Sequence, residues 1–278
     1  MEKPVPLSPP GRRNMLLTIA FFLFLGVALY SAAQIFIDLR EYIASENEYE
    51  KLRAMCGPPE ITVAAVLPSP PETEEEAPVL DEAAEEEEAP PSAAAAEAPP
   101  APPAPPRDPA EINPEYAGWL KISGAKINYP VAKGADNEKY LNTSFEGRKS
   151  GLGAIFMDYR CASDFSGYHT IVYGHNAKTG AMFGTLAKYA DEAYLEKNRI
   201  ITVTLPDGQK DIWRIFAAYK SDISDPSYRL DFSGPESFAE FAASLGAPEG
   251  TAYIMTLSTC TTGGSNDERM LVHAAIVQ

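Results

Sequence analysis

The chain has few cysteines for its 278 residues, and residues 107–278 have no excess of basic side chains. Three cysteines, an odd and sparse set, do not form the framework of a disulfide-stapled domain. Residues 107–278 hold 17 Lys and Arg against 21 Asp and Glu, so this part of the chain is mildly acidic. Nucleic-acid binding needs a basic face. The composition therefore argues against a disulfide scaffold and against a nucleic-acid partner.

One long uncharged run lies near the N-terminus. Residues 15–37 contain no charged side chain, and as an α-helix they would measure about 35 Å, enough to cross a hydrocarbon core of about 30 Å. Basic residues predominate before the run, so the positive-inside rule places residues 1–14 in the cytoplasm and the rest of the chain outside the membrane. The alternative is a cleaved signal peptide with small residues at 31–33, but the run is long for one. We expect a single-pass protein of the cell membrane whose folded domain is extracellular.

Two segments follow the predicted transmembrane anchor. Residues 38–56 predict a juxtamembrane helix with a partial apolar stripe, which either packs on the folded domain or stands in solvent. Residues 57–108 predict a disordered acidic linker, because 57–106 hold fourteen prolines and twelve acidic residues with no Lys or Arg. Such a composition cannot bury a core. The linker is either an inert spacer or a tether that lets the folded domain move away from the bilayer.

Residues 109–278 have the pattern of a compact, mainly β domain. Eight short β-rich stretches are separated by turns, among them the hairpin signal Pro206-Asp207-Gly208. Closure into a barrel removes exposed strand edges. We therefore expect a closed antiparallel β-barrel of eight strands with flanking short helices. The expected strands are 119–122, 127–131, 154–158, 170–173, 200–205, 212–219, 252–259 and 270–277, and the expected helices are 136–142, 181–189 and 236–245.

Three chemically active side chains stand at predicted strand ends. Cys260 ends one β-rich stretch, Arg269 opens the next after a small polar loop, and His175 lies at another strand-to-loop junction. Rigid scaffolds present chemistry at such junctions. A thiol needs a base to become nucleophilic, an imidazole can take and return the proton, and a guanidinium can donate to a carbonyl oxygen as it becomes an oxyanion. The three residues are the parts of a thiol acyl-transfer site.

The segment Thr256-Leu257-Ser258-Thr259-Cys260, with Arg269 nine residues later, resembles the signature of the sortases. The resemblance covers about residues 109–278 and is to class B in particular. Two departures are the small polar loop 261–268 and the unusually long acidic linker. The other segments that carry the resemblance are 113–122 (NPEYAGWLKI), 127–131 (INYPV), 154–160 (AIFMDYR), 173–176 (YGHN) and 180–184 (GAMFG).

The resemblance implies a sortase-type barrel and a membrane-anchored cysteine transpeptidase of a Gram-positive-type cell envelope. Such an enzyme cleaves the C-terminal sorting signal of a surface or pilin protein after threonine and holds the acyl group as a thioester. An amine of a peptidoglycan precursor or a pilin lysine then takes the acyl group. The implied catalytic residues are His175, Cys260 and Arg269, and the resemblance implies no cofactor and no metal. The sorting motif and the acceptor amine stay open.

Other polar residues near these strand ends are weaker candidates. Ser258, Thr259, Tyr173 and Asn176 are predicted substrate-binding residues, although strand packing explains Ser258 and Thr259 nearly as well.

Four further residues are interpreted as bystanders. We expect His273 to be structural, His169 to be an exposed loop residue, and Cys56 and Cys161 to be thiols without a role.

Two other functions fit parts of the pattern. A peptidoglycan L,D-transpeptidase also uses cysteine, histidine and arginine, but that family places its histidine close before the cysteine and an arginine two residues after it. Here Cys260 is followed by Thr261-Thr262, and His175 is 85 residues away. A non-catalytic barrel that only binds surface proteins is the second alternative, yet such a protein usually lacks one of the three groups.

Overall fold

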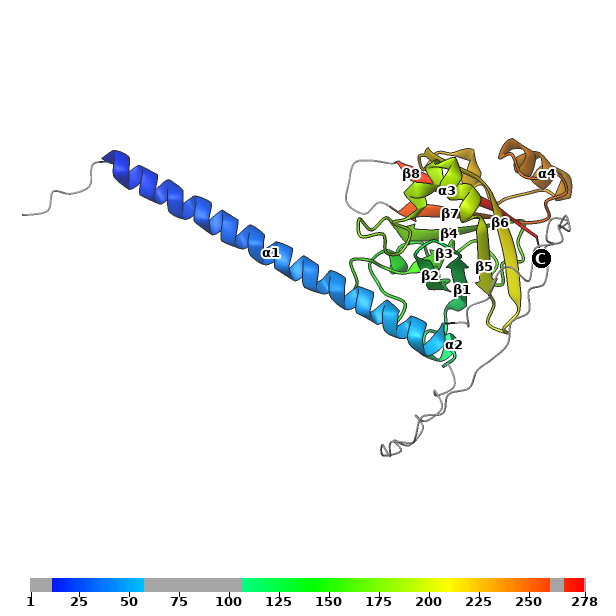
Figure 1. Ribbon diagram of the computed structural model, residues 1–278, viewed down its shortest axis with the longest axis horizontal. Helices are drawn as coiled ribbons and strands as arrows, with labels where there is room; N and C mark the ends of the chain where they lie inside the picture. Colours follow the sequence, from blue (N-terminus) through cyan, green and yellow to red (C-terminus); the bar gives the residue numbers. More distant parts are fainter. Residues whose placement is uncertain (1–11, 58–106, 261–267, 278) are drawn as a thin grey trace, which may run out of the picture. The chain divides into compact units, whose positions relative to one another are not determined.

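The computed structural model describes residues 12–57, 107–260 and 268–277 (Figure 1). The predicted disordered linker lies almost entirely outside the described residues, as do most of the predicted cytoplasmic N-terminus and of the loop before Arg269. The domain limits proposed from the sequence therefore stay predictions.

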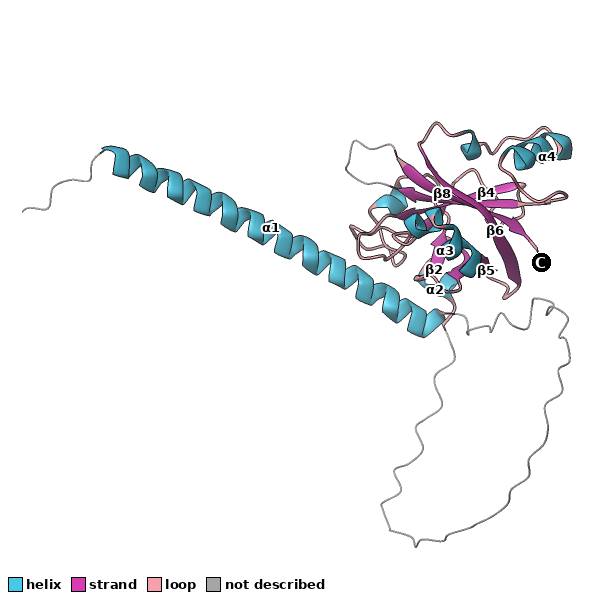
Figure 2. Cartoon of the chain, turned by 45° about the horizontal axis from the view of Figure 1, so that its top comes forward, coloured by secondary structure: helices cyan, strands magenta, loops and turns pink. Residues whose placement is uncertain are grey.

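Eight strands form a closed barrel, as predicted (Figures 1 and 2). Their order around the barrel is β1-β2-β3-β4-β7-β8-β6-β5. Most of the expected strands appear within a few residues of their predicted limits. The strands are β1 (Tyr116–Ile122), β2 (Ile127–Ala132), β3 (Ile155–Met157), β4 (His169–His175), β5 (Ile200–Thr204), β6 (Lys210–Ser221), β7 (Ile254–Cys260) and β8 (Arg269–Ile276).

The prediction of a wholly antiparallel barrel is wrong. The neighbouring pairs β2–β3 and β4–β7 are parallel, whereas the other pairs are antiparallel. Parallel neighbours need a long crossover connection rather than a tight turn. Long segments do separate these partners, residues 133–154 in the first case and 176–253 in the second. Local strand patterns carry no information on which distant strands become neighbours.

The helices around the barrel are short. The helix expected at 136–142 is the 3₁₀ turn η2 (Lys139–Leu141), and the one expected at 181–189 starts later, as η3 (Leu186–Ala190) followed by α3 (Glu192–Lys197). The helix expected at 236–245 is present as α4 (Pro235–Ser244), one face of which buries Phe238 and Phe241. The remaining helices are α1 (Arg12–Cys56), α2 (Pro109–Ile112) and the 3₁₀ turn η4 (Pro226–Tyr228).

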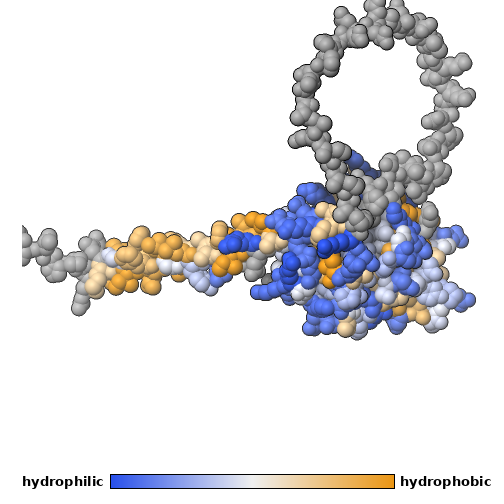
Figure 3. All heavy atoms as spheres, turned by 90° about the horizontal axis from the view of Figure 1, so that it is seen from below, coloured by the Kyte–Doolittle hydropathy of each residue, from blue (hydrophilic) through white to orange (hydrophobic). Residues whose placement is uncertain are grey.

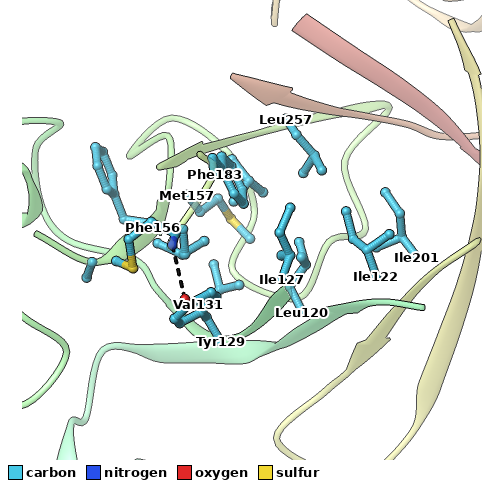
Figure 4. Close-up of a cluster of buried hydrophobic side chains, with 14 of the residues drawn as sticks. Leu120, Ile122, Ile127, Tyr129, Val131, Phe156, Met157, Phe183, Ile201 and Leu257 are labelled. Atoms are coloured by element: carbon cyan, nitrogen blue, oxygen red, sulfur yellow. Dashed lines mark hydrogen bonds between the residues drawn. The ribbon is translucent and has the colours of Figure 1, made fainter. Parts of the chain in front are cut away.

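The barrel interior is filled by branched and aromatic side chains from all sides of the sheet. Alternate residues of a strand point to the same face, so β1 and β2 each send several apolar side chains inward. Burying each such side chain contributes roughly 1.5–3 kcal/mol. The fully buried residues in the close-up include Leu120, Ile122, Ile127, Val131, Met157, Phe183, Ile201 and Leu257 (Figure 4).

The predicted transmembrane and juxtamembrane segments form one helix, α1. Its N-terminal part exposes large apolar side chains along residues 15–37, and the orange surface in Figure 3 marks this run. Among the described residues, α1 is the one helix that is long and apolar enough to cross a membrane. Length and composition therefore agree with the predicted anchor.

The C-terminal part of α1 packs on the barrel, which resolves the alternative left open by its sequence. Tyr49, Leu52 and Cys56, spaced three and four residues apart, are buried. The Tyr49 hydroxyl donates to the carbonyl of Gly153 at 2.8 Å and accepts from the Phe145 amide at 3.1 Å. We call residues 42–56, which make these contacts, the docked part of α1.

The described residues directly before and directly after the segment 58–106 lie next to each other. The Gly57 amide donates to the Arg53 carbonyl at the end of α1, and the Arg107 amide donates to the Met55 carbonyl at 2.8 Å. Residues 58–106 therefore join two neighbouring backbone positions. This closure argues against a tether that separates the barrel from α1.

Candidate functional site

The three predicted catalytic residues lie on adjacent strands at one end of the barrel. His175 is the last residue of β4 and Cys260 the last of β7, and the parallel register pairs them directly. Arg269 is the first residue of β8, which runs antiparallel beside β7 with Ser258 opposite Leu271. The end of β7 and the start of β8 therefore share this end of the sheet (Figure 1). Residues 85 and 94 positions apart in sequence become neighbours through the order β4-β7-β8.

The His175 imidazole is partly buried, and desolvation lowers its pKa from the ordinary value. Burial disfavours the charged form, so the imidazole is neutral near pH 7 and available as a base. The backbone carbonyl of His175 accepts from the Phe183 amide at 3.0 Å. The next residue, Asn176, forms an isolated bridge with Met182. The loop 176–183 thus closes back onto the end of β4.

Gly174, directly before His175, is required by packing. A Cβ built there would lie 2.5 Å from Cδ1 of Ile155 and 2.6 Å from Cγ of Phe183. Real side chains do not approach this closely, so the neighbouring residues or the strand would have to move. The absence of a side chain lets β4 lie against Phe183 and sets the backbone position of His175.

Gly174→Ala is therefore expected to lower the free energy of unfolding by about 1–3 kcal/mol and to reduce activity, because overpacking shifts the end of β4. Urea unfolding and peptide cleavage measure the two effects. Gly151→Ala is the matched control, since nothing lies within 4 Å of its Cβ position. Equal stability and activity of the two variants would contradict the packing argument.

Arg269 is partly exposed, and its Nη1 donates to the Glu268 carbonyl at 3.2 Å. A guanidinium keeps its charge at any pH at which the protein folds. The side chain can therefore supply a permanent positive charge at this end of the barrel.

The four predicted substrate-binding residues have different surroundings. Ser258 and Thr259 are buried; the Ser258 hydroxyl bonds with the Tyr228 hydroxyl at 2.7 Å, and that of Thr259 accepts from the Met270 amide. Asn176 is exposed. These contacts give Ser258 and Thr259 structural partners, and a substrate-binding role for any of the four stays a prediction.

Tyr173 belongs to a polar cluster that the sequence did not reveal. Its hydroxyl donates to the fully buried carboxylate of Asp158 at 3.0 Å, which also accepts from Arg160 at 2.9 Å and from Asn137. Arg160 and Asn137 hold the pKa of Asp158 below its ordinary value despite the burial that raises it. The sequence signal for this cluster was the segment 154–160, and the spacing of its residues does not predict that Asp158 bonds to Tyr173 and Asn137.

His169 is not the exposed loop residue expected from the sequence. It opens β4, is buried, and bonds through Nε2 to the Thr256 hydroxyl at 2.7 Å and through Nδ1 to the Arg229 carbonyl at 2.7 Å. His273 is buried, in agreement with its predicted structural role, and its Nδ1 bonds to the same hydroxyl at 2.9 Å. A hydroxyl can donate to one ring while it accepts from the other. The three side chains form one buried chain.

Both buried histidines make stability depend on pH. Desolvation lowers the pKa of His169 from 6.5 to about 4 and that of His273 to about 3. The unfolded chain binds protons at pH 6.5 while the folded chain does not, so stability is complete above pH 6.5 and falls as the pH drops below it. We expect a loss of about 1 kcal/mol per histidine between pH 7 and 5.5. Urea unfolding at the two values measures it; His169→Gln should remove about half of the dependence, and a flat profile would contradict the argument.

Among the residues that the structure describes, no group of three or more His, Cys, Asp or Glu side chains is arranged to hold a metal ion.

Comparisons with known proteins agree on one family. A model of the sortase domain matches residues 120–277. Sortase B of Staphylococcus aureus is 33% identical over 178 residues, 60% of this chain and 72% of that protein, and sortase B of Listeria monocytogenes is 30% identical over 181 residues, 62% and 73%. A solved Staphylococcus aureus sortase B–substrate complex superposes with a TM-score of 0.57 at 32% identity, over 61% of this chain and 83% of that one. The chain therefore belongs to the sortase family of cysteine transpeptidases, with class B relatives in both comparisons.

Proposed function

We propose that this sortase cleaves a C-terminal sorting signal after threonine, holds the threonyl group as a thioester on Cys260 and transfers it to an amine. Cys260 is the nucleophile, His175 the acid–base group and Arg269 the donor to the carbonyl oxygen. The observation that carries the proposal is the strand register, which pairs His175 with Cys260 and brings the start of β8 to the same end of the barrel.

The proposed reaction has two acyl transfers. His175 takes the proton of the Cys260 thiol, the thiolate attacks the threonyl carbonyl carbon, and Arg269 donates to the oxygen as it becomes negative. The C–N bond then breaks, and the leaving amine takes the proton held by His175. In the second transfer an acceptor amine attacks the thioester and gives a proton to His175, and the thiolate leaves and takes that proton back as a thiol. Each transfer forms one bond to the carbonyl carbon and breaks one, so over the two transfers one amide bond breaks and one forms.

The partners and location follow from the same proposal. The donors are surface or pilin proteins with a sorting signal, in line with the substrate complex of the similar Staphylococcus aureus enzyme. The acceptor is an amine of a peptidoglycan precursor or of a pilin. The apolar part of α1 supports a single membrane crossing, and the basic residues before it support a cytoplasmic N-terminus with the barrel outside.

Mass spectrometry of the trapped acyl-enzyme tests the proposal. The full chain in detergent micelles is exposed to a library of peptides with internal Thr–Gly or Thr–Asn bonds and quenched in acid. The expected result is an adduct on Cys260 that ends in threonine, absent when a competing amine is added before quenching. An adduct ending in another residue, or none on a thiol that iodoacetamide still alkylates, would overturn the proposal. The first outcome would change the specificity, and the second would favour a binding barrel.

A further inference from the structure

A buried tyrosine connects the docked part of α1 with the loop that follows His175. The hydroxyl of Tyr129, on β2, accepts from the Met182 amide at 3.0 Å (Figure 4). Its ring meets the ring of Tyr49 edge to face, with 5.3 Å between centroids. The Arg53 guanidinium lies over the same ring, 5.3 Å from its centroid. Tyr129 therefore contacts α1 through its ring and the loop 176–183 through its hydroxyl.

The amide that donates to the Tyr129 hydroxyl belongs to Met182, whose backbone conformation is strained. Met182 is fully buried and has a positive φ of 51°, a conformation that costs energy for a residue with a side chain. It bridges back to Asn176, and the next amide, that of Phe183, donates to the His175 carbonyl. A strained turn persists only when its surroundings hold it. The hydrogen bond from Met182 to Tyr129 is one of those restraints.

The helix side of the contact is fixed as well. The Tyr49 hydroxyl bonds to two backbone groups of the barrel, at Gly153 and Phe145. The ring of Tyr49 therefore has little freedom to move away from Tyr129. Edge-to-face ring pairs and a cation over a ring both stabilise such a contact beyond the burial of apolar surface.

We propose that Tyr129 is a positioning residue for His175 and that the docked part of α1 takes part in this positioning through Tyr49 and Arg53. The inference deepens the proposed function, since it concerns the orientation of the acid–base group. Tyr129 does not touch the reacting atoms in this scheme. It holds the turn at Met182, which closes the loop onto the carbonyl of His175.

A small shift of His175 has a large consequence for the rate. Proton transfer needs the imidazole within hydrogen-bond distance of the thiol and of the leaving amine. A misplacement of about 1 Å can lower a rate by about a hundredfold. Removing the Tyr129 hydroxyl also leaves the buried Met182 amide without its acceptor, and such groups rearrange to find another.

Tyr129→Phe in the full chain tests the proposal, because it keeps the ring and removes the hydroxyl. We expect kcat for a sorting peptide to fall about tenfold, with KM within twofold of the unaltered value. Tyr189→Phe is the matched control: its buried hydroxyl donates to the Asn198 carbonyl at 2.8 Å, which is not part of the loop 176–183. Its kcat should change less than twofold. Equal kcat in the two variants, at equal stability in urea, would overturn the proposal.

A second measurement does not need a substrate. The chain has three histidines, so NMR can follow each imidazole during a pH titration, with His175→Gln to assign the signal. Tyr129→Phe is expected to raise the pKa of His175 toward its ordinary value as the loop opens to water, while Tyr189→Phe leaves it unchanged. An unchanged His175 titration in Tyr129→Phe would overturn the inference even if the peptide is cleaved. If no peptide is cleaved but the titration shifts, the proposed function fails and the inference stands.

The contribution of α1 has its own variant. Tyr49→Leu removes the ring contact, and we expect kcat to fall and the His175 titration to shift in the same direction as in Tyr129→Phe, by a smaller factor of about two to five. Ile43→Ala, on the exposed side of the same helix, is the control and should change neither. A Tyr49→Leu protein that behaves as Ile43→Ala would remove α1 from the proposal.

Discussion

Cys260→Ala is expected to lose measurable cleavage of every sorting peptide, a fall in kcat of roughly 10⁴-fold or more. The proposed reaction forms its intermediate on this thiol, so no other group of the site can replace it. His175→Ala and Arg269→Ala should each lower kcat steeply as well, and combining them with Cys260→Ala should add little. When residues act together in one reaction step, the effects of their substitutions do not add.

The other two cysteines provide the controls for this experiment. Cys56 and Cys161 are buried free thiols, and burial raises the pKa of both, that of Cys161 to about 11. A thiol with a raised pKa forms little thiolate and reacts slowly. Cys56→Ala and Cys161→Ala should therefore keep activity within about threefold. If Cys260→Ala retained cleavage while Cys161→Ala lost it, the nucleophile would be misassigned.

The barrel could be predicted from local pattern, but its topology could not. Short β-rich stretches with turns between them indicate a closed sheet, and most strands lie near their predicted limits. Which strands become neighbours depends on contacts between residues far apart in sequence. The parallel pair β4–β7 brings His169 beside Ile254 and His175 beside Cys260. No feature of either strand alone predicts this pairing.

The same reason explains the error at His169. The residue stands one position before a predicted strand, in a stretch that resembles a loop. Its hydrogen-bond partners, Thr256 and Arg229, are 87 and 60 residues away in the sequence. By contrast, Cys260, His175 and Arg269 could be singled out because strand ends and family-like segments are local signals.

The apolar stripe predicted for residues 38–56, which consists of Leu39, Tyr42, Ile43, Tyr49 and Leu52, is only partly buried. Leu39 and Ile43 are exposed, whereas Tyr49 and Leu52 are buried, together with Cys56, which is not part of the predicted stripe. An apolar residue of a helix is buried only where another part of the fold packs against it. The sequence pattern predicts the helix, but which of its residues are buried depends on barrel contacts such as that between Tyr49 and Gly153.

The docked helix also changes the expected role of residues 58–106. If these residues were a tether, the barrel would be attached to the membrane through them alone. The contacts of Tyr49, Leu52 and the Ser45–Ser150 hydroxyl pair, 2.9 Å apart, instead attach the barrel to α1 before that segment begins. The Arg107 amide closes the loop on Met55. Removing residues 60–105 should then leave the reach of the enzyme, and its product formation on the cell surface, unchanged.

Cutting the chain between residues 58 and 106 is expected to leave the barrel on the membrane. A protease site inserted near residue 80 allows the cut in membrane vesicles, and sedimentation then shows which fraction holds residues 107–278. Burial of Tyr49 and Leu52 contributes roughly 1.5–3 kcal/mol each, so the double variant Tyr49→Ala/Leu52→Ala should release the cut barrel into solution. Leu39→Ala/Ile43→Ala, on exposed positions of the same helix, should retain it.

A disulfide between Ser45→Cys and Ser150→Cys makes the result independent of how tightly the cut pieces hold together. The two hydroxyl oxygens are 2.9 Å apart, so cysteines at these positions can join without moving the backbone far. After oxidation and cutting, the two fragments should run as one band without reductant and as two with it, while either single cysteine variant gives two bands in both cases. Release of the cut barrel together with failure of this cross-link would show that the acidic segment is a tether after all, and that α1 is bound to the barrel too weakly to orient Tyr129.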